Sequence, residues 1–137
     1  MARLTSLVLV VRDLDHALAV YERGLGMAQI EPVREVASLA ARRVVLQADD
    51  CTVELLEPHD DSRPPGMFLR DRGEGVFALT IGVDDPGRAR ERLGRSGVDL
   101  VFPPDAPEGH PATRCFVRPR DAHGILLEVG PVDPPGD

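Results

Sequence analysis

The sequence repeats its own pattern after 72 residues, and this repeat limits the possible folds more than any other feature. An apolar run ends at an aspartate in both copies, and the matched pairs are Leu7 and Leu79, Leu9 and Ile81, Val11 and Val83, and Asp13 and Asp85. When the offset is widened to 74 by one loop difference, Glu54 falls on Glu128. Such self-similarity indicates two copies of one supersecondary unit.

Each copy is predicted to contain one strand, one helix and three further strands. In the first copy, Asp13 can cap a helix that Gly24 and Gly26 then end. The expected elements are a strand at 4–11, a helix at 14–23, and strands at 27–33, 39–47 and 51–57. Helical spacing predicts a buried stripe made of Leu14, Leu18, Tyr21 and Leu25.

The second copy has the same order, with Asp85 as the expected cap and Pro86 as the first helical residue. The expected elements are a strand at 76–83, a helix at 86–95, and strands at 98–102, 113–118 and 124–130. We therefore expect an α+β fold in which two βαβββ modules form a concave half-barrel. The expected organisation is a single domain over 1–137, with modules at 1–57 and 76–130, a Pro/Gly-rich connector at 58–75 and a disordered tail at 131–137.

Composition and charge exclude several classes of function. The net charge is −7 and no basic stripe is interleaved with aromatic residues, which argues against nucleic acid as a partner. All 16 basic residues are arginines, so a Schiff-base lysine is excluded. The chain has no membrane-length apolar run and no signal-peptide pattern, and we expect a cytoplasmic protein. Cys51 and Cys115 stand alone in the sequence and are expected to be buried, reduced thiols.

Strand alternation places the two repeated glutamates on the face opposite the helices. Large aliphatic residues flank Glu54 and Glu128 and suit the helix side of each strand. The residues expected on the opposite face are Ser6, Val8 and Val10 in the first copy and Ala78, Thr80 and Gly82 in the second. Because these residues include small and polar groups, we expect this face to line a hollow where both carboxylates meet. The alternative is that each glutamate lies at a strand end in water.

Arginines on neighbouring strands are expected on the same face. Alternation turns Arg43 and Gln47 inward on one strand, and Arg114, Phe116 and Arg118 inward on another. An inward arginine can hold a carboxylate or phosphate group of a ligand by a two-point contact. The alternative is a structural ion pair in which such an arginine neutralises Glu54 or Glu128.

The order of motifs resembles the vicinal-oxygen-chelate superfamily, which includes glyoxalase, bleomycin-resistance and dioxygenase proteins, and within it the methylmalonyl-CoA epimerase branch. The matching segments are Asp13-Leu-Asp-His-Ala, Gly24-Leu-Gly-Met, Val53-Glu-Leu-Leu-Glu-Pro, Phe68-Leu-Arg-Asp-Arg-Gly-Glu-Gly, Phe116-Val-Arg-Pro and Gly124-Ile-Leu-Leu-Glu. They cover nearly the whole chain. The resemblance implies the paired βαβββ fold, a concave active site and a divalent metal held by one residue from each of four strands.

The resemblance places the four metal-binding positions at Ser6, Glu54, Ala78 and Glu128, where the family has histidine at the first and third. Alanine has no donor atom, and a serine hydroxyl is a weak ligand for a transition metal. No histidine of the chain stands at these four positions. All four histidines are expected to lie in a turn or on the surface, and they are His16, His59, His110 and His123. We therefore expect no metal ligands of the family type and no tightly bound cofactor, although two carboxylates with water can hold a hard ion weakly.

The leading hypothesis is a metal-independent isomerase, epimerase or cyclase that acts on a small carbonyl-containing substrate. Glu54 and Glu128 would form an acid–base pair that titrates as a unit. The candidate substrate-binding residues are Ser6, Arg43, Gln47, Ala78, Thr80, Arg114 and Phe116.

Two alternatives stay open: a non-catalytic, antibiotic-type binding protein with the same fold, and a metal-dependent epimerase-like enzyme with a rearranged site. The absence of Trp and an aromatic fraction of 4% weaken the first, because stacking on a flat ligand needs large rings. A homodimer is expected, since edge strands of an open half-barrel need covering.

Overall fold

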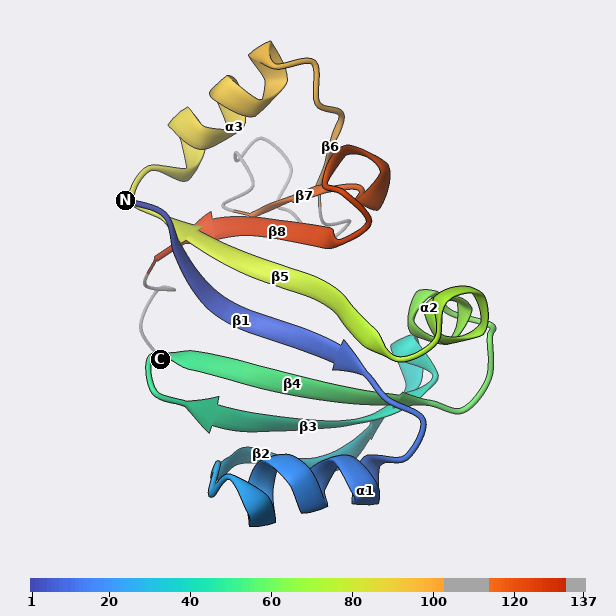
Figure 1. Cartoon of the computed structure of the whole chain (residues 1–137). Coiled ribbons are helices and arrows are strands. Elements are labelled where there is room, and N and C mark those ends of the chain that lie inside the picture. Colours follow the sequence, from blue (N-terminus) through green and yellow to red (C-terminus); the bar gives the residue numbers. More distant parts are fainter. Residues whose placement is uncertain (103–113, 133–137) are drawn as a thin grey trace. The chain divides into compact units, whose positions relative to one another are not determined.

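Strands and helices follow the predicted βαβββ order in both halves of the chain (Figure 1), in a computed structural model that describes residues 1–102 and 114–132. The elements of the first half are β1 (Arg3–Val10), α1 (Leu14–Leu18), a π-helical turn (Ala19–Gly24), β2 (Gln29–Val36), a 3₁₀ turn (Ala37–Leu39), β3 (Ala41–Ala48) and β4 (Cys51–Pro58). Those of the second half are β5 (Gly75–Val83), α3 (Pro86–Arg95), β6 (Leu100–Val101), β7 (Cys115–Val117), a 3₁₀ turn (Pro119–Asp121) and β8 (Leu126–Pro131). The α+β fold class is confirmed.

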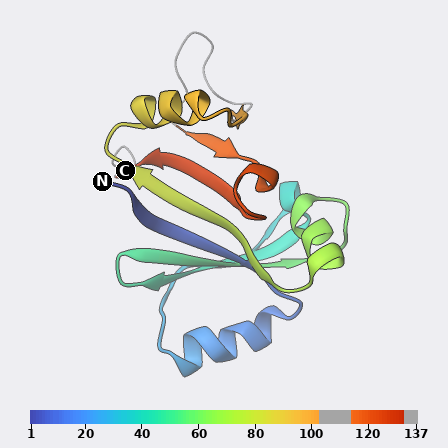
Figure 2. The same cartoon turned by 45° about the horizontal axis from the view of Figure 1, so that its top comes forward.

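Two units divide the chain between them, and each is described by itself. The first unit is Ser6–Phe77, and the second is Met1–Thr5 with Ala78–Asp137. The strand order is β2-β3-β4-β1 in the first half and β5-β8-β7-β6 in the second (Figures 1 and 2). In both, the first strand is parallel to the last, β1 to β4 and β5 to β8. The concave half-barrel and the expected module bounds stay predictions, and the tail beyond residue 132 and His110 lie outside the described residues.

The strand register confirms the internal repeat residue by residue. Val8 is paired with Glu54 across β1 and β4, and Thr80 is paired with Glu128 across β5 and β8. These are the partners that offsets of 72 and 74 predict. Both glutamates therefore occupy the same place in their repeat, on the last strand beside the first.

The core of the first unit lies between α1 and the sheet. Leu14, Ala17 and Leu18 of α1 are buried against Val44, Leu46 and Leu55, and Leu9, Val11 and Tyr21 pack against this cluster. The buried stripe is thus confirmed, except that Leu25 is 68% exposed. The prediction fails there because the chain leaves the α-helix after Leu18: the Leu25 N–H bonds to the Val20 carbonyl (3.1 Å). This wider π-helical turn changes the direction of the following side chains.

Helices α1 and α3 begin where the sequence predicted. The Asp13 carboxylate accepts from the backbone N–H of His16 (3.1 Å), and the Asp85 carboxylate accepts from that of Arg88 (3.0 Å). These bonds satisfy N–H groups that have no partner within the helix. No helix among the described residues is long and apolar enough to cross a membrane.

A helix that the sequence analysis did not predict, α2 (Pro64–Arg72), lies in the connector. Its first residues are Pro64 and Pro65, which fit the first turn of a helix, and Gly73 ends it with φ +83°. Gly66 is required for packing, because a Cβ atom there would lie 1.7 Å from the carbonyl oxygen of Asp60. The prolines and glycines of this segment indicated a loop. In the structure the two prolines begin a helix, Gly66 allows its close packing, and Gly73 ends it.

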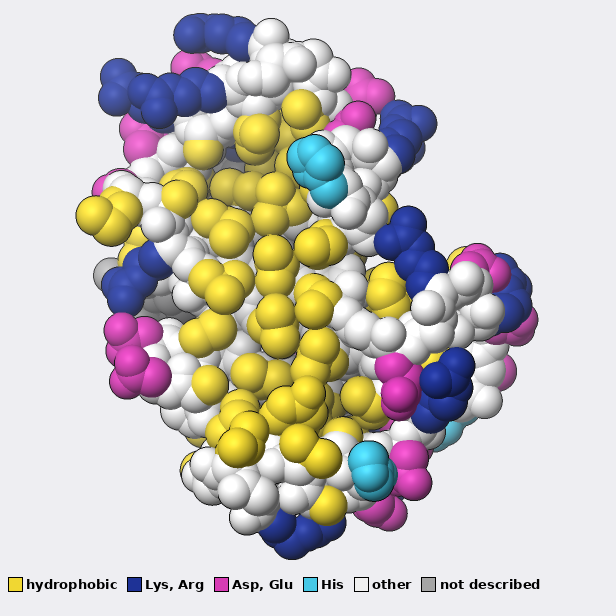
Figure 3. Space-filling model, in the orientation of Figure 1, with side chains coloured by type: hydrophobic (Ala, Val, Ile, Leu, Met, Phe, Trp, Pro, Cys, Tyr) yellow, Lys and Arg dark blue, Asp and Glu magenta, His cyan; other side chains and the backbone are white. Residues whose placement is uncertain are grey.

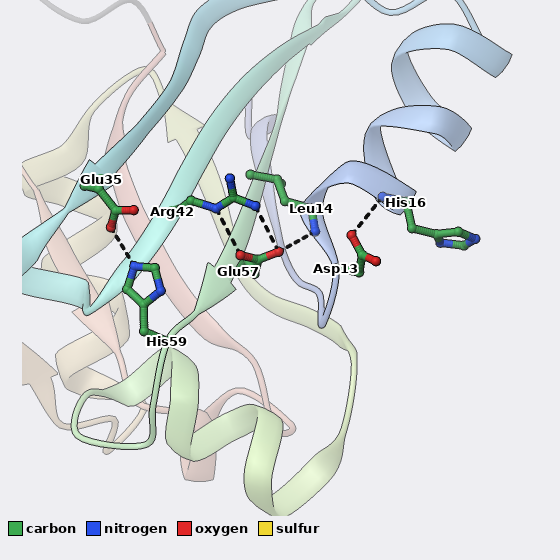
Figure 4. A network of polar contacts seen from close by, with 7 residues as sticks. All are labelled: Asp13, Leu14, His16, Glu35, Arg42, Glu57 and His59. Atoms are coloured by element: carbon green, nitrogen blue, oxygen red, sulfur yellow. Dashed lines mark hydrogen bonds and ion pairs between the residues drawn. The ribbon is translucent and has the colours of Figure 1, made fainter.

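The carboxylate of Glu57 ties the start of α1 to the sheet (Figure 4). It accepts from the Leu14 N–H (2.7 Å) and from Arg42 Nε and Nη2 (3.0 and 3.3 Å). Partial burial alone would raise the pKa of Glu57, but these hydrogen bonds and the charge of Arg42 outweigh it, so the net pKa lies below its ordinary value. The ionised carboxylate therefore stabilises the first unit.

We predict that Glu57→Gln lowers the free energy of unfolding by roughly 1–2 kcal/mol near neutral pH. Because the folded-state pKa is lowered, the contribution is present above the pKa of an unfolded-chain glutamate and disappears as the pH falls through the folded value. Urea unfolding from pH 7 to pH 3 should therefore show the difference between variant and wild type shrinking as the solution is acidified. Glu91→Gln on the exposed face of α3 is the control, with no expected effect; equal differences at all pH values would contradict the assignment.

Candidate functional site

In the first unit, Glu54 lies on β4 opposite Val8 of β1 and Val45 of β3. Its neighbours Val53 and Leu55 pack on the α1 side, so alternation puts the Glu54 side chain on the other face. This face is less open than the sequence analysis expected. Val10, Val45 and Leu56, which share the face, are each below 10% exposed. In the first unit this face is a buried apolar layer and does not line the hollow that was expected, because aliphatic residues from β3 and β4 join those of β1.

Arg43 is the partner of Glu54. Its Nε donates to Glu54, and its Nη1 donates to Glu31 Oε2 on β2 (2.6 Å). Partial burial alone lowers the pKa of Arg43, but Glu54 and then Glu31 outweigh it through hydrogen bonds and charge, so the net pKa is raised and the guanidinium stays charged. Glu54 is therefore neither a strand-end carboxylate in water nor an unpaired group in an apolar layer.

In the second unit, Glu128 has two partners. Arg114 Nη1 donates to Glu128 Oε1 (2.9 Å), and Thr80 Oγ1 donates to Glu128 Oε2 (3.2 Å). Thr80 belongs to β5, beside Glu128 of β8, and Phe116 of β7 lies on the other side of the glutamate. One hydrogen bond to each oxygen fixes the plane of the carboxylate.

The two arginine–glutamate pairs occupy equivalent places in the repeat. Arg43 comes two residues before Val45, the β3 residue opposite Glu54. Arg114 comes two residues before Phe116, the β7 residue opposite Glu128. Each repeat therefore carries the same diagonal ion pair across its last two strands. The ion pair that the sequence left as an alternative for these arginines is present in both units.

The two arginine–glutamate pairs differ in how far their side chains are exposed to solvent. The side chains of Arg43 and Glu54 are 21% and 18% exposed, and Glu31 adds a second carboxylate. The Arg114 side chain is 49% exposed, and Glu128 is its only carboxylate partner among the described residues. Glu31 was not predicted as a site residue. The sequence of β2 shows no alternating buried face from which the direction of the Glu31 side chain could be predicted.

Gln47 lies on the predicted strand, but its amide is already engaged. The side-chain nitrogen donates to the backbone carbonyls of Asp49 and Cys51, at the turn between β3 and β4. Ser6 lies beside Thr52, and Ala78, which is 8% exposed, lies beside Leu126. Ser6 and Ala78 are thus equivalent positions, as the repeat predicts.

The described histidines and cysteines do not gather around the glutamates. His123 has φ +62°, which confirms a turn residue, and His59 donates to Glu35 (2.5 Å) (Figure 4). Cys115 is buried and Cys51 half-buried, and burial raises the pKa of both thiols. Over residues 1–102 and 114–132, no three His, Cys, Asp or Glu side chains are grouped to hold a metal ion.

The sequence profile of the Glyoxalase/Bleomycin resistance protein/Dioxygenase superfamily matches residues 3–129. The chain belongs to this superfamily. The match confirms the resemblance drawn from the motifs, and it includes both glutamates and both arginines.

Individual relatives extend the similarity over nearly the full chain. The uncharacterized protein YqjC of Bacillus subtilis is 27% identical over 100% of this chain and 96% of its own length. The crystal structure of methylmalonyl-CoA epimerase from Mycobacterium tuberculosis is 30% identical, with a TM-score of 0.73 over 96% of this chain and 88% of that chain. A Streptomyces coelicolor methylmalonyl-CoA epimerase variant, in complex with 2-nitronate-propionyl-CoA, is 24% identical with a TM-score of 0.70, covering 93% and 94% of the two chains, and shows the same fold.

We predict that Arg43→Met destabilises the protein by about 1–3 kcal/mol, because it leaves Glu31 and Glu54 facing each other without a cation. The double variant Arg43→Met with Glu54→Gln should recover part of this loss, since it removes one of the two charges. Arg95→Met, at an exposed position of α3, is the matched control. Chemical denaturation would measure the wild type, the single variants Arg43→Met and Glu54→Gln, the double variant and the control. Additive losses in the double variant would mean that Arg43 and Glu54 are not coupled.

Proposed function

We propose that this protein is an enzyme of the isomerase or epimerase type in which Glu54 and Glu128 move a proton next to the carbonyl group of a small substrate. The observation that carries the proposal is the half-buried carboxylate that stands at the same register in both repeats, each held by an arginine. Epimerisation next to a carbonyl needs one group to remove a proton from carbon and another to return it. Two equivalent carboxylates suit this division.

We infer that the reaction proceeds without a tightly held metal. The first unit would offer Ser6 and Glu54 as ligands, and the second Ala78 and Glu128. Alanine supplies no donor, and a neutral serine hydroxyl is a weak ligand. The glutamate oxygens already accept hydrogen bonds from guanidinium groups, whose positive charge opposes a cation. These residues do not fit the metal that the fold family implies.

The arginines would orient the carboxylates in place of a metal. An ionised carboxylate has about four acceptor positions, so Glu128 can keep its bonds to Thr80 and Arg114 and still accept a proton. The half-exposed Arg114 has further N–H donors that suit a carboxylate or phosphate group on the substrate. Because the similar Mycobacterium tuberculosis protein is a methylmalonyl-CoA epimerase, acyl-CoA thioesters are the first substrate class to test.

A second candidate is a binding protein without catalysis. It is favoured by the same ion pairs, because a carboxylate that only neutralises an arginine needs no chemical role. The two candidates differ in stoichiometry: a binding protein holds one equivalent of ligand, whereas an enzyme turns over many.

We predict that the protein catalyses exchange of the proton next to the thioester carbonyl of 2-methyl-branched acyl-CoA esters, methylmalonyl-CoA first, in deuterium oxide. Glu54→Gln and Glu128→Gln should each lower the rate by about 10²–10⁴-fold, because an amide cannot carry the proton. Mass spectrometry of the recovered ester measures the exchange.

Glu57→Gln is the matched control, since it makes the same change on β4 on the opposite face, and it should keep the wild-type rate. Full activity in both Glu54→Gln and Glu128→Gln would end the acid–base assignment. Stoichiometric binding without any exchange would instead identify the binding protein.

A further inference from the structure

Gly130 of β8 lies beside Arg114 in the second unit and leaves space for it. The ladder between β7 and β8 pairs Cys115 with Val129, so the residues next to them, Arg114 and Gly130, also lie side by side. A Cβ atom on Gly130 would lie 3.2 Å from Arg114 Cγ, 3.8 Å from Nε and 3.9 Å from Cδ, and these would be its three nearest atoms. The arginine stem therefore occupies the space that a side chain at position 130 would take.

The equivalent position in the first repeat holds a large side chain. The offset of 74 that pairs Glu54 with Glu128 also pairs Leu56 with Gly130. Leu56 is 2% exposed and is paired with Arg43 across β3 and β4. One arginine of the repeat thus lies beside a buried leucine, and the other lies beside a residue without a side chain.

The two arginines present different nitrogens to their glutamates. Arg43 donates from Nε to Glu54 and from Nη1 to Glu31, so two of its nitrogens are engaged by carboxylates. Arg114 donates from Nη1 to Glu128 (2.9 Å), and residues 1–102 and 114–132 give its guanidinium no other hydrogen bond. The Nε and Nη2 donors form one edge of the planar group, and this edge of Arg114 can receive a ligand.

Exposure alone does not distinguish Arg114, because the chain has many surface arginines. In Figure 3, dark blue basic side chains around α3 lie near magenta acidic ones, and Arg95 pairs with Glu91 there. The stem of Arg114, in contrast, lies along a strand at Gly130. A supported stem has fewer conformations to lose when its head binds a ligand.

We propose that Gly130 is a positioning residue: it lets Arg114 reach Glu128 with Nη1 while the Nε–Nη2 edge binds a carboxylate group of the substrate. A carboxylate accepts two parallel hydrogen bonds from such an edge. The substrate class is then a carbonyl compound that carries a separate carboxylate. This inference rests on the proposed function, because the bound carboxylate belongs to the molecule whose proton Glu128 moves.

The test titrates the full chain with methylmalonate, and the uncharged methylmalonamide is the control ligand. The ¹⁵N signal of the Arg114 Nε–H group, assigned by its loss in Arg114→Lys, reports on the proposed edge. We expect a saturable shift with methylmalonate and none with the diamide. Gly130→Leu, which copies the first repeat, should raise the dissociation constant roughly fivefold or more, because the leucine displaces the arginine stem. Gly130→Ala should have a smaller effect in the same direction.

Gly94→Leu is the matched control variant. It makes the same substitution at an exposed position of α3, where a Cβ atom would meet nothing within 4 Å, and it should bind methylmalonate like the wild type. Gly130 lies within β8 and has no positive φ, so its backbone accepts a side chain and thermal unfolding should show a folded variant. If Gly130→Leu does not fold, Gly130→Ala decides the question.

Unchanged affinity in the folded Gly130 variants would overturn the proposal. So would equal binding of methylmalonamide, or a wild type that does not bind methylmalonate. If one of these results accompanies proton exchange in the acyl-CoA ester, only the carboxylate site is refuted and the proposed reaction stands. A shifted Arg114 Nε–H signal without any exchange in the ester would support the carboxylate site and refute the reaction.

Discussion

A carboxylate inside an apolar strand must have a counter-charge, and this requirement shapes both halves of the structure. Moving an unpaired ionised group out of water costs several kcal/mol even after relaxation. Glu54 and Glu128 stand among aliphatic residues on the last strand of each repeat. Glu54 contacts Arg43 of the neighbouring β3, and Glu128 contacts Arg114, which immediately precedes the neighbouring β7. The strand register brings the partners together, because residues two apart along a strand share a face and a diagonal neighbour across the ladder is within reach of a long side chain.

The arginines also determine what chemistry is open to the glutamates. The resemblance to metal-binding members of the superfamily implies histidines beside the carboxylates, and this chain has Ser6 and Ala78 at the corresponding positions. A guanidinium neutralises a carboxylate without occupying a coordination sphere, so the oxygen atoms stay available to a proton. The first pair is closed by Glu31, whereas the second is half-exposed and includes the hydroxyl of Thr80. The two repeats therefore share the same strand register, but the Arg114–Glu128 pair is more accessible to solvent than the Arg43–Glu54 pair.

Much of the fold could be predicted because local signals agreed with the repeat. Asp13 and Asp85 both cap helices, and the offsets of 72 and 74 predicted the paired residues of β1 with β4 and of β5 with β8. Leu25 was misplaced because helical spacing assumes an α-helix throughout, and hydrogen bonding at the end of this helix is of the π type. Helix α2 was missed because Pro64, Pro65 and Gly66 are rare in helices, and the close approach of Gly66 to Asp60 is a tertiary requirement. Alternation correctly turned Arg43 and Arg114 toward the glutamates, whereas Arg118 lies beyond the end of β7 and is exposed. The choice between ligand and ion pair depends on side-chain reach across strands.

We propose that the guanidinium groups of Arg43 and Arg114 supply the positive charge that a metal would supply to Glu54 and Glu128. The most direct measurement is elemental analysis of protein purified without chelator, followed by calorimetric titration with Co²⁺, Ni²⁺ and Mg²⁺. We expect no stoichiometric metal in the purified protein and no tight binding of Co²⁺ or Ni²⁺, with at most weak binding of Mg²⁺. One equivalent of tightly bound Co²⁺ or Ni²⁺ would contradict this proposal, because a metal would then supply positive charge that the guanidinium groups are proposed to supply.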